Sequence, residues 1–126
     1  MVINFNPKYI PGDIVYNHKK EIIRITSSYL KGTKLFYYRD GDYGWIREDA
    51  IAPIPLTTEL LEKNGWREEK GDYINDNYHI RLCEKIDGYS AYKVVNDTIV
   101  WLRYVESVSD LQHLFFGLNL NSEMEV

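Results

Sequence analysis

The chain has 126 residues and carries 15 Lys and Arg against 19 Asp and Glu, so its formal net charge is −4. Apolar residues make up 44% and charged residues 27%, which is typical of a folded globular protein and excludes a largely disordered chain. The acidic total disfavours non-specific attraction to nucleic-acid backbones, and the longest apolar runs fall far short of the roughly 20 residues that span a bilayer.

The beginning of the chain and its cysteine content bear on its location. The sequence has one cysteine, Cys83, which cannot form a disulfide within the chain. Residues 1–13 lack the basic segment and apolar run of a signal peptide. We therefore expect a cytoplasmic protein with no membrane segment.

The first region, residues 1–55, has the pattern of four short strands. A Pro-Gly-Asp turn precedes an alternating apolar run, so the first strand is expected to begin at Asp13. β-branched residues at 22–26 predict a second strand, and residues 32–49 predict two aromatic strands separated by a turn at 40–42. Because strands this short cannot cover both faces of a flat sheet, we expect an SH3-like small β-barrel.

The stretch IPLTTELLEKNGW, residues 54–66, predicts a short helix with a defined start. Thr57 is a good N-cap, since its hydroxyl can accept a hydrogen bond from a free amide of the first turn, so the helix should begin at Thr58. Leu56 and Leu61 have the spacing of a hydrophobic staple across that cap.

The end of this helix is marked as clearly as its start. Gly65 suits the left-handed position after a helix C-terminus, which brings Trp66 against Leu61. Two helical turns are not stable alone, so the helix must pack on a sheet. We interpret it as a joint, with Leu61 as the anchor shared by the barrel at 1–55 and an α+β unit at 56–126.

Turn residues divide the second unit into antiparallel strands. They lie at 70–71, 75–77, 87–88 and 96–97. Alternation in the following segment predicts one core face, made of Tyr78, Ile80, Leu82 and Ile86. Residues 98–105, TIVWLRYV, are apolar on both faces, which predicts a central strand covered on its second side.

The last element is an amphipathic helix in residues 107–118, with an apolar stripe at helical spacing. Ser107 is its expected N-cap, with Asp110 completing a weaker capping box, and the helix should end at Gly117 or Asn119. The tail, residues 121–126, is expected to be frayed. The whole chain is thus predicted to be α+β, a barrel followed by an antiparallel sheet with two short helices.

The sequence contains no recognisable catalytic or metal-binding constellation. Cys83 and His79 would lie four residues apart on one strand, about 13 Å, which is too far for a hydrogen bond, and His113 could approach only through folding. Neither a zinc spacing nor a phosphate loop is present, and Asp40 and Asp42 have the pattern of a hairpin turn. We expect no enzyme activity, no cofactor and no metal.

The one functional surface that the sequence supports is aromatic and lies on the paired strands of the first unit. The chain has 11 Tyr, 4 Phe and 3 Trp, residue types that favour strands. Successive residues of a strand point to opposite faces, so at least one of two neighbouring tyrosines is expected in the core. The candidate binding residues are Tyr37, Tyr38, Tyr43, Trp45, Arg39 and Arg47, with Lys34 nearby.

The junctions between these elements resemble those of short uncharacterised proteins of gut bacteria and their phages or mobile elements. In those proteins a small barrel opens near a Gly-Asp pair, a PIPLT junction leads into a short helix that ends at Gly-aromatic, and the final helix carries a Leu-Gln pair. The residues that match are Gly12, Asp13, Pro53, Ile54, Pro55, Leu56, Thr57, Gly65, Leu111 and Gln112. The resemblance covers nearly the whole chain and implies no enzyme chemistry.

These observations lead to a ranked set of functional hypotheses. We expect an accessory protein of a phage or mobile element that acts by binding another protein. The alternative is single-stranded nucleic-acid binding, with aromatic strands stacking bases while Lys34, Arg39 and Arg47 meet phosphates. An enzyme is the third hypothesis and would need a deep pocket lined by His79, Cys83 or His113. The partner and the oligomeric state stay open.

Overall fold

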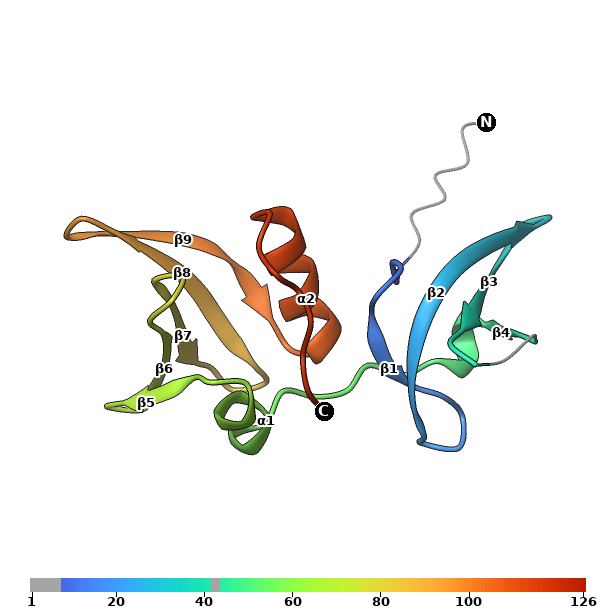
Figure 1. The fold of residues 1–126 in the computed structure, drawn as a ribbon, viewed down its shortest axis with the longest axis horizontal. Helices are drawn as coiled ribbons and strands as arrows, with labels where there is room; N and C mark the ends of the chain where they lie inside the picture. The colour runs from blue at the N-terminus through green and yellow to red at the C-terminus, as the bar shows by residue number, and fades with distance from the viewer. Residues whose placement is uncertain (1–7, 42–43) are drawn as a thin grey trace. The chain divides into compact units, whose positions relative to one another are not determined.

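The computed structural model describes residues 8–41 and 44–126, and the chain divides into two compact units, Met1–Ile54 and Pro55–Val126 (Figure 1). Each unit is built on an antiparallel sheet, and the described residues form four strands in the first and five in the second. Both α-helices belong to the second unit. The predicted α+β class is confirmed.

The first unit is a curled sheet in the order β1-β2-β3-β4. The register shifts between Ile25 and Ser27, and this bulge lets the long second strand bend. Beyond the last strand, an antiparallel bridge joins Ala52 to Tyr16 through hydrogen bonds of 2.9 and 3.0 Å, which curls the sheet into a half-barrel. The elements are β1 (Ile14–Tyr16), β2 (Ile22–Lys31), β3 (Lys34–Arg39), β4 (Trp45–Arg47) and the 3-10 turn η1 (Glu48–Ala50).

The core of the first unit is centred on two tyrosines. Tyr37 is fully buried and meets Tyr9 edge to face, with ring centroids 5.6 Å apart. Its hydroxyl donates to the carboxylate of Glu48 and accepts from the backbone N–H of Tyr9 at 3.4 Å. The polar end of a core ring is therefore satisfied inside the half-barrel. The apolar residues around the pair are Val15, Ile23, Ile25 and Ile51.

The short central helix, α1 (Thr58–Lys63), has both predicted caps. Thr57 Oγ1 accepts from the backbone N–H of Leu60 at 3.2 Å. Gly65 has a φ of +84°, and the Trp66 N–H donates to the Leu61 carbonyl at 3.0 Å, which completes a Schellman ending. The prediction of this helix and its ends is confirmed.

Leu61 is fully buried, but its role differs from the one predicted. We expected it to be an anchor shared by two units. The structure places it in a core cluster built only from residues of the second unit, together with Trp66, Leu111 and Phe115. The helix therefore belongs to the second unit, and its two caps hold Leu61 in the core of that unit.

The second unit is a five-stranded meander in the order β5-β6-β7-β8-β9. One face of the sheet carries buried residues that pack with α1 and α2, among them Tyr73, Leu82 and Val105. The elements are β5 (Arg67–Glu69), β6 (Asp72–Asn75), β7 (Ile80–Glu84), β8 (Tyr89–Val95), β9 (Thr98–Val105) and α2 (Val108–Gly117).

Two strand predictions in this unit were wrong. β7 ends at Glu84, so Ile86 lies in the following turn with 99% of its side chain exposed instead of joining the core. β9 was expected to be central, yet it is an edge strand whose first residues, 98–101, are exposed. Apolar residues on both faces of a strand were interpreted as burial, but the order of strands in a sheet depends on pairings that a local pattern does not record.

The C-terminal helix ends in an ordered tail. Ser107 Oγ accepts from the Asp110 N–H at 3.2 Å, and Asn119, with a φ of +59°, takes the left-handed position after the helix. The Asn64 side chain then exchanges two hydrogen bonds of 2.8 Å with the backbone of Glu125. The expected fraying is therefore wrong, because a contact made across 61 residues holds the tail.

Candidate functional site

The outer side of the first sheet gathers four aromatic residues, Tyr29, Phe36, Tyr38 and Trp45, which we call the aromatic face. Tyr29 lies opposite Phe36 in the β2–β3 register, and Tyr38 lies opposite Trp45 in the β3–β4 register. Phe36 and Tyr38 are two residues apart on β3, so they point to the side away from buried Tyr37. Three strands thus contribute to one ring cluster.

The rings of the aromatic face support one another while remaining open to solvent. The Phe36 and Trp45 centroids are 4.0 Å apart, and Tyr29 meets Trp45 edge to face at 5.7 Å. Trp45 is nevertheless 42% exposed and Tyr29 47% exposed. Mutual packing fixes the ring orientations before any ligand arrives, which lowers the entropic cost of binding.

Basic side chains border the aromatic face. Lys31 Nζ lies 5.4 Å from the Trp45 ring centroid, within cation–π range. Arg47 is opposite Phe36 on β4 and pairs with exposed Asp49 at 2.7 Å. Lys34 begins β3, two residues before Phe36, and is exposed. The rings therefore lie beside cations, and one of these, Arg47, already forms an ion pair with a carboxylate.

An open groove lies next to this face and carries both signs of charge. It has a volume of about 480 Å³ and its lining includes Lys8, Lys34, Arg47, Glu48 and Asp49. Glu48, which lines the groove, also accepts the hydrogen bond of the Tyr37 hydroxyl. Burial, followed by this hydrogen bond to Glu48, raises the pKa of Tyr37 far above its ordinary value. The phenol therefore stays protonated as a structural donor.

The structure sorts the candidate binding residues from the sequence into three groups. Tyr38, Trp45 and Arg47 come together on the outer side of the sheet. Tyr37 is fully buried and is a core residue of the first unit. Tyr43 lies outside the described residues.

Arg39 also departs from the predicted cluster. It is half-buried, lies opposite Ile25 of β2, and is two residues from Tyr37, so it belongs to the opposite side of β3 from the aromatic face.

Sequence reasoning missed Tyr29, Phe36 and Lys31. The signal that could have found them is the Gly32-Thr33 turn, because a two-residue hairpin loop fixes which residues of its strands face each other.

Two of the residues considered for catalysis, Cys83 and His79, lie on β7 and in the turn before it. Cys83 is half-buried on β7 opposite Asp72, and burial, followed by the charge of Asp72, raises the pKa of its thiol, whereas a nucleophilic thiol needs a lowered pKa. His79 lies in the turn before β7 with a φ of +56°. Across residues 8–41 and 44–126, no three His, Cys, Asp or Glu side chains are grouped as a metal site would require.

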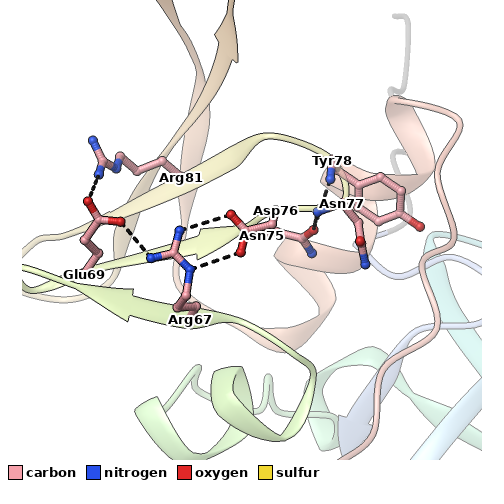
Figure 2. Close-up of polar contacts among 7 residues, drawn as sticks. All are labelled: Arg67, Glu69, Asn75, Asp76, Asn77, Tyr78 and Arg81. Carbon is pink, nitrogen blue, oxygen red and sulfur yellow. Dashed lines mark hydrogen bonds and ion pairs between the residues drawn. The ribbon is translucent and has the colours of Figure 1, made fainter.

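A network of ion pairs covers the β5 end of the second sheet. Figure 2 shows Arg67 held by both carboxylate oxygens of Asp76, at 3.0 and 3.1 Å, and by Glu69 at 2.7 Å. Arg81 reaches the other oxygen of Glu69 at 3.9 Å. The Arg67 guanidinium lowers the pKa of both Asp76 and Glu69. These charges satisfy one another at the surface, so the network has a structural role.

The turn beside this network is also held by local bonds. Asn75 Oδ1 accepts from the backbone N–H groups of Asn77 and Tyr78 at 3.1 and 3.2 Å, as Figure 2 shows. Such an Asx turn lets a short side chain replace backbone partners. Asn75 therefore holds the turn between β6 and β7, directly beside Asp76, which pairs with Arg67.

Charge is divided unequally along the sequence. Residues 1–54 hold eight Lys and Arg against six Asp and Glu, which gives +2. Residues 55–126 hold seven against thirteen, which gives −6. The aromatic face thus lies on a mildly basic unit, a fact that the overall charge of −4 conceals.

Comparison with protein-family models, curated proteins and solved structures gives no match to this chain. Among the helices that the structure describes, none has the length and apolar character needed to cross a membrane.

Proposed function

We propose that the chain is a cytoplasmic binding module, an accessory protein of a phage or mobile element that docks another protein through the aromatic face. The observation that carries the proposal is the fixed yet half-exposed ring cluster, with Trp45 at 42% and Tyr29 at 47% exposure. Large aromatic side chains and Arg dominate the binding energy of protein interfaces. The assignment to a phage or mobile element is supported by the resemblance of the junction residues.

The charges around the face favour a protein partner over a polyanion. Arg47 is paired with Asp49, and Glu48 lines the adjoining groove. Carboxylates in this position repel a phosphate backbone, whereas a protein surface can present a cation to them and an acidic group to Lys31. The partner that fits best therefore has an apolar patch with charges of both signs at its rim.

The test is capture of a partner from the native host, followed by measurement of its affinity. The chain is immobilised beside the double variant Tyr29→Ser, Trp45→Ser, and captured proteins are compared. The matched control is Trp101→Ser, which removes a ring of similar exposure, 58%, from the second unit. A captured protein is then purified and its Kd for each variant is measured by calorimetry.

We expect the aromatic variant to weaken binding at least about tenfold, because central interface rings contribute about 2 kcal/mol or more. The control should bind like the unchanged chain. Equal binding by the aromatic variant, or a loss only in the control, contradicts the proposed docking surface.

Single-stranded nucleic acid is a second candidate, favoured by the +2 charge of residues 1–54 and by exposed rings beside Lys31 and Lys34. Bases stack on aromatic rings at about 1–3 kcal/mol each, and cations meet the backbone. Fluorescence anisotropy with labelled oligo-dT and oligo-rU at low salt tests it. A Kd that tightens below millimolar and weakens steeply with salt supports this candidate, and binding weaker than millimolar rejects it.

A further inference from the structure

The second unit contains a small cavity between the β6–β7 turn, α2 and the C-terminal tail. Its volume is about 180 Å³, and all of its lining residues belong to that unit. Four of the lining residues are asparagines, namely Asn64, Asn75, Asn77 and Asn121. An asparagine side chain offers two N–H donors and a carbonyl acceptor, and such groups need partners from protein, water or ligand. The hydrogen bonds of these amides therefore indicate which ligand the cavity can hold.

The Asn64 amide is engaged by the protein at both ends and holds one wall of the cavity. Its Nδ2 donates to the Leu60 carbonyl at 2.7 Å and to the Glu125 carbonyl at 2.8 Å. Its Oδ1 accepts from the Glu125 N–H at 2.8 Å. The tail is thus tied to the end of α1, which keeps Asn121 and Glu123 in place beside the cavity.

Asn75 and Asn121 use their oxygen on the backbone and keep their N–H donors. Asn75 Oδ1 accepts from the backbone N–H groups of Asn77 and Tyr78, at 3.1 and 3.2 Å (Figure 2). Asn121 Oδ1 accepts from the Glu123 N–H at 3.0 Å. Asn75 is only 8% exposed, and within the part of the chain that the structure describes its Nδ2 has no acceptor. The cavity therefore has a donor on its buried side and another at its mouth, where Asn121 is exposed.

The groups on the cavity wall disfavour ions of either sign. Glu123 is the one charged side chain among the lining residues that the structure describes, and its carboxylate repels an anion. An ammonium group has only donors, so it cannot accept from the Asn75 amide. A hydroxyl both donates and accepts, so it suits an amide donor as well as an acidic wall. The wall therefore favours a neutral ligand with several hydroxyl groups.

The size of the cavity and its aromatic rings limit the ligand further. A volume of about 180 Å³ corresponds to roughly six water molecules, well below the several hundred Å³ of a site for a drug-sized molecule. Trp66 and Phe115 line the cavity but are only 4% and 7% exposed. So little ring surface gives a flat base no platform for stacking, but it can contact the C–H groups of a compact ligand.

We propose that this cavity binds a neutral polyhydroxylated molecule the size of a single sugar ring. Asn75 Nδ2 donates to one hydroxyl oxygen on the buried side, and Asn121 Nδ2 donates to another at the mouth. The C–H groups of the ligand contact Trp66 and Phe115. The site lies in the second unit, so it does not depend on docking through the aromatic face.

Titration of the full chain, followed by proton–nitrogen correlation NMR, tests the site with defined probes. The probes are glucose, galactose, two charged counterparts of glucose (glucuronate and glucosamine), and uracil as a flat ligand. We expect glucose or galactose to shift the side-chain amide signal of Asn75 with a Kd of about a millimolar, the scale for a ligand of so few atoms. The other three should bind at least about tenfold more weakly than the better sugar. No shift from either neutral sugar at about ten times that Kd, or equally tight binding of any of the other three, overturns the proposal.

A matched pair of variants tests the role of the Asn75 donor. Asn75→Asp keeps an oxygen for the backbone N–H groups of the turn but removes the donor, so sugar binding should weaken at least about tenfold. Asn96→Asp adds the same charge at an exposed turn residue outside the cavity lining and should bind like the unchanged chain. If Asn75→Asp lowers the melting temperature, Asn121→Asp makes the same change at an exposed residue and should weaken binding several-fold. Unchanged binding in both cavity variants, or an equal loss in Asn96→Asp, overturns the proposal.

Discussion

Each unit leaves one apolar hairpin in solvent, and the two hairpins are supported in different ways. In the β2–β3 hairpin, Tyr29 and Phe36 pack on Trp45 of a third strand, and Lys31 lies over that ring. In the β8–β9 hairpin, the exposed apolar residues near the turn are mostly aliphatic, among them Val95, Ile99 and Val100. A tyrosine or tryptophan ring can hydrogen-bond to water at its polar end and contact a cation at its face, so it tolerates solvent. A strand of exposed aliphatic residues lacks these contacts and favours pairing with another strand. The difference favours a docking role for the first hairpin, whose rings are already held in place.

Leu61→Ala should produce the largest effect on stability and should separate the unfolding transitions of the two units. Leu61 is fully buried in the core beneath the second sheet, and removing such a side chain costs about 2–5 kcal/mol. We expect urea unfolding to show an early transition of the second unit. The aromatic face should retain its Trp45 fluorescence through that transition. Simultaneous loss of both units would show that their stabilities are coupled.

Gly88→Ala should have the next largest effect, and it acts at the start of β8, beside the last residue of β9. A Cβ on Gly88 would lie 2.5 Å from the backbone oxygen of Val105, which cannot move without shifting β9. Overpacking of this kind costs about 1–3 kcal/mol. The melting temperature of the second unit should fall. Gly117→Ala is the control, because a Cβ there meets nothing within 4 Å.

The features that the sequence predicted correctly are those encoded by near neighbours. Thr57 and Gly65 define α1 because an N-cap and a left-handed C-terminal glycine act within one helical turn. Ser107 defines the start of α2 for the same reason. Alternation along β3 required either Tyr37 or Tyr38 to be a core residue, but it did not identify which one.

The features that the sequence did not predict depend on pairing between distant residues. β9 has the composition of a central strand, and only its place after β8 in the sheet makes it an edge. The contact between Asn64 and Glu125 spans 61 residues, so the polar tail gave no local sign of it. Tyr29 joined the candidate site only through its register with Phe36. When a site is built from several strands, the pairing of the strands decides which residues come together, and composition alone does not show it.

Tyr37→Phe should have an effect of similar size in the first unit, and it tests the core that lies behind the aromatic face. The change removes the hydroxyl that donates to Glu48, and losing a hydrogen bond to a charged group costs about 1.5–3 kcal/mol. The pKa of Tyr37 is raised in the folded state, so its contribution is complete below pH 10 and is lost as pH rises further toward the folded pKa.

Alkaline titration of unfolding measures this contribution. In the unchanged chain, the stability of the first unit should decline above about pH 10, since the unfolded phenol ionises while the folded one resists. Tyr37→Phe should flatten that decline. Burial also raises the pKa of Tyr73 and Tyr89, so the second unit provides an internal reference whose alkaline decline persists in the variant. An unchanged slope in the first unit would show that Tyr37 ionises freely.

The smallest effect on stability is expected from removing the exposed rings, Trp45→Ala and Trp101→Ala, and the comparison of the two is the sharpest. Trp45 packs on two rings and has Lys31 at 5.4 Å, contacts that contribute about 0.5–1.5 kcal/mol each. Trp101 is 58% exposed and lies opposite Tyr92 of β8. In urea unfolding, Trp45→Ala should lower the free energy of unfolding by about 1–2 kcal/mol, and Trp101→Ala by less.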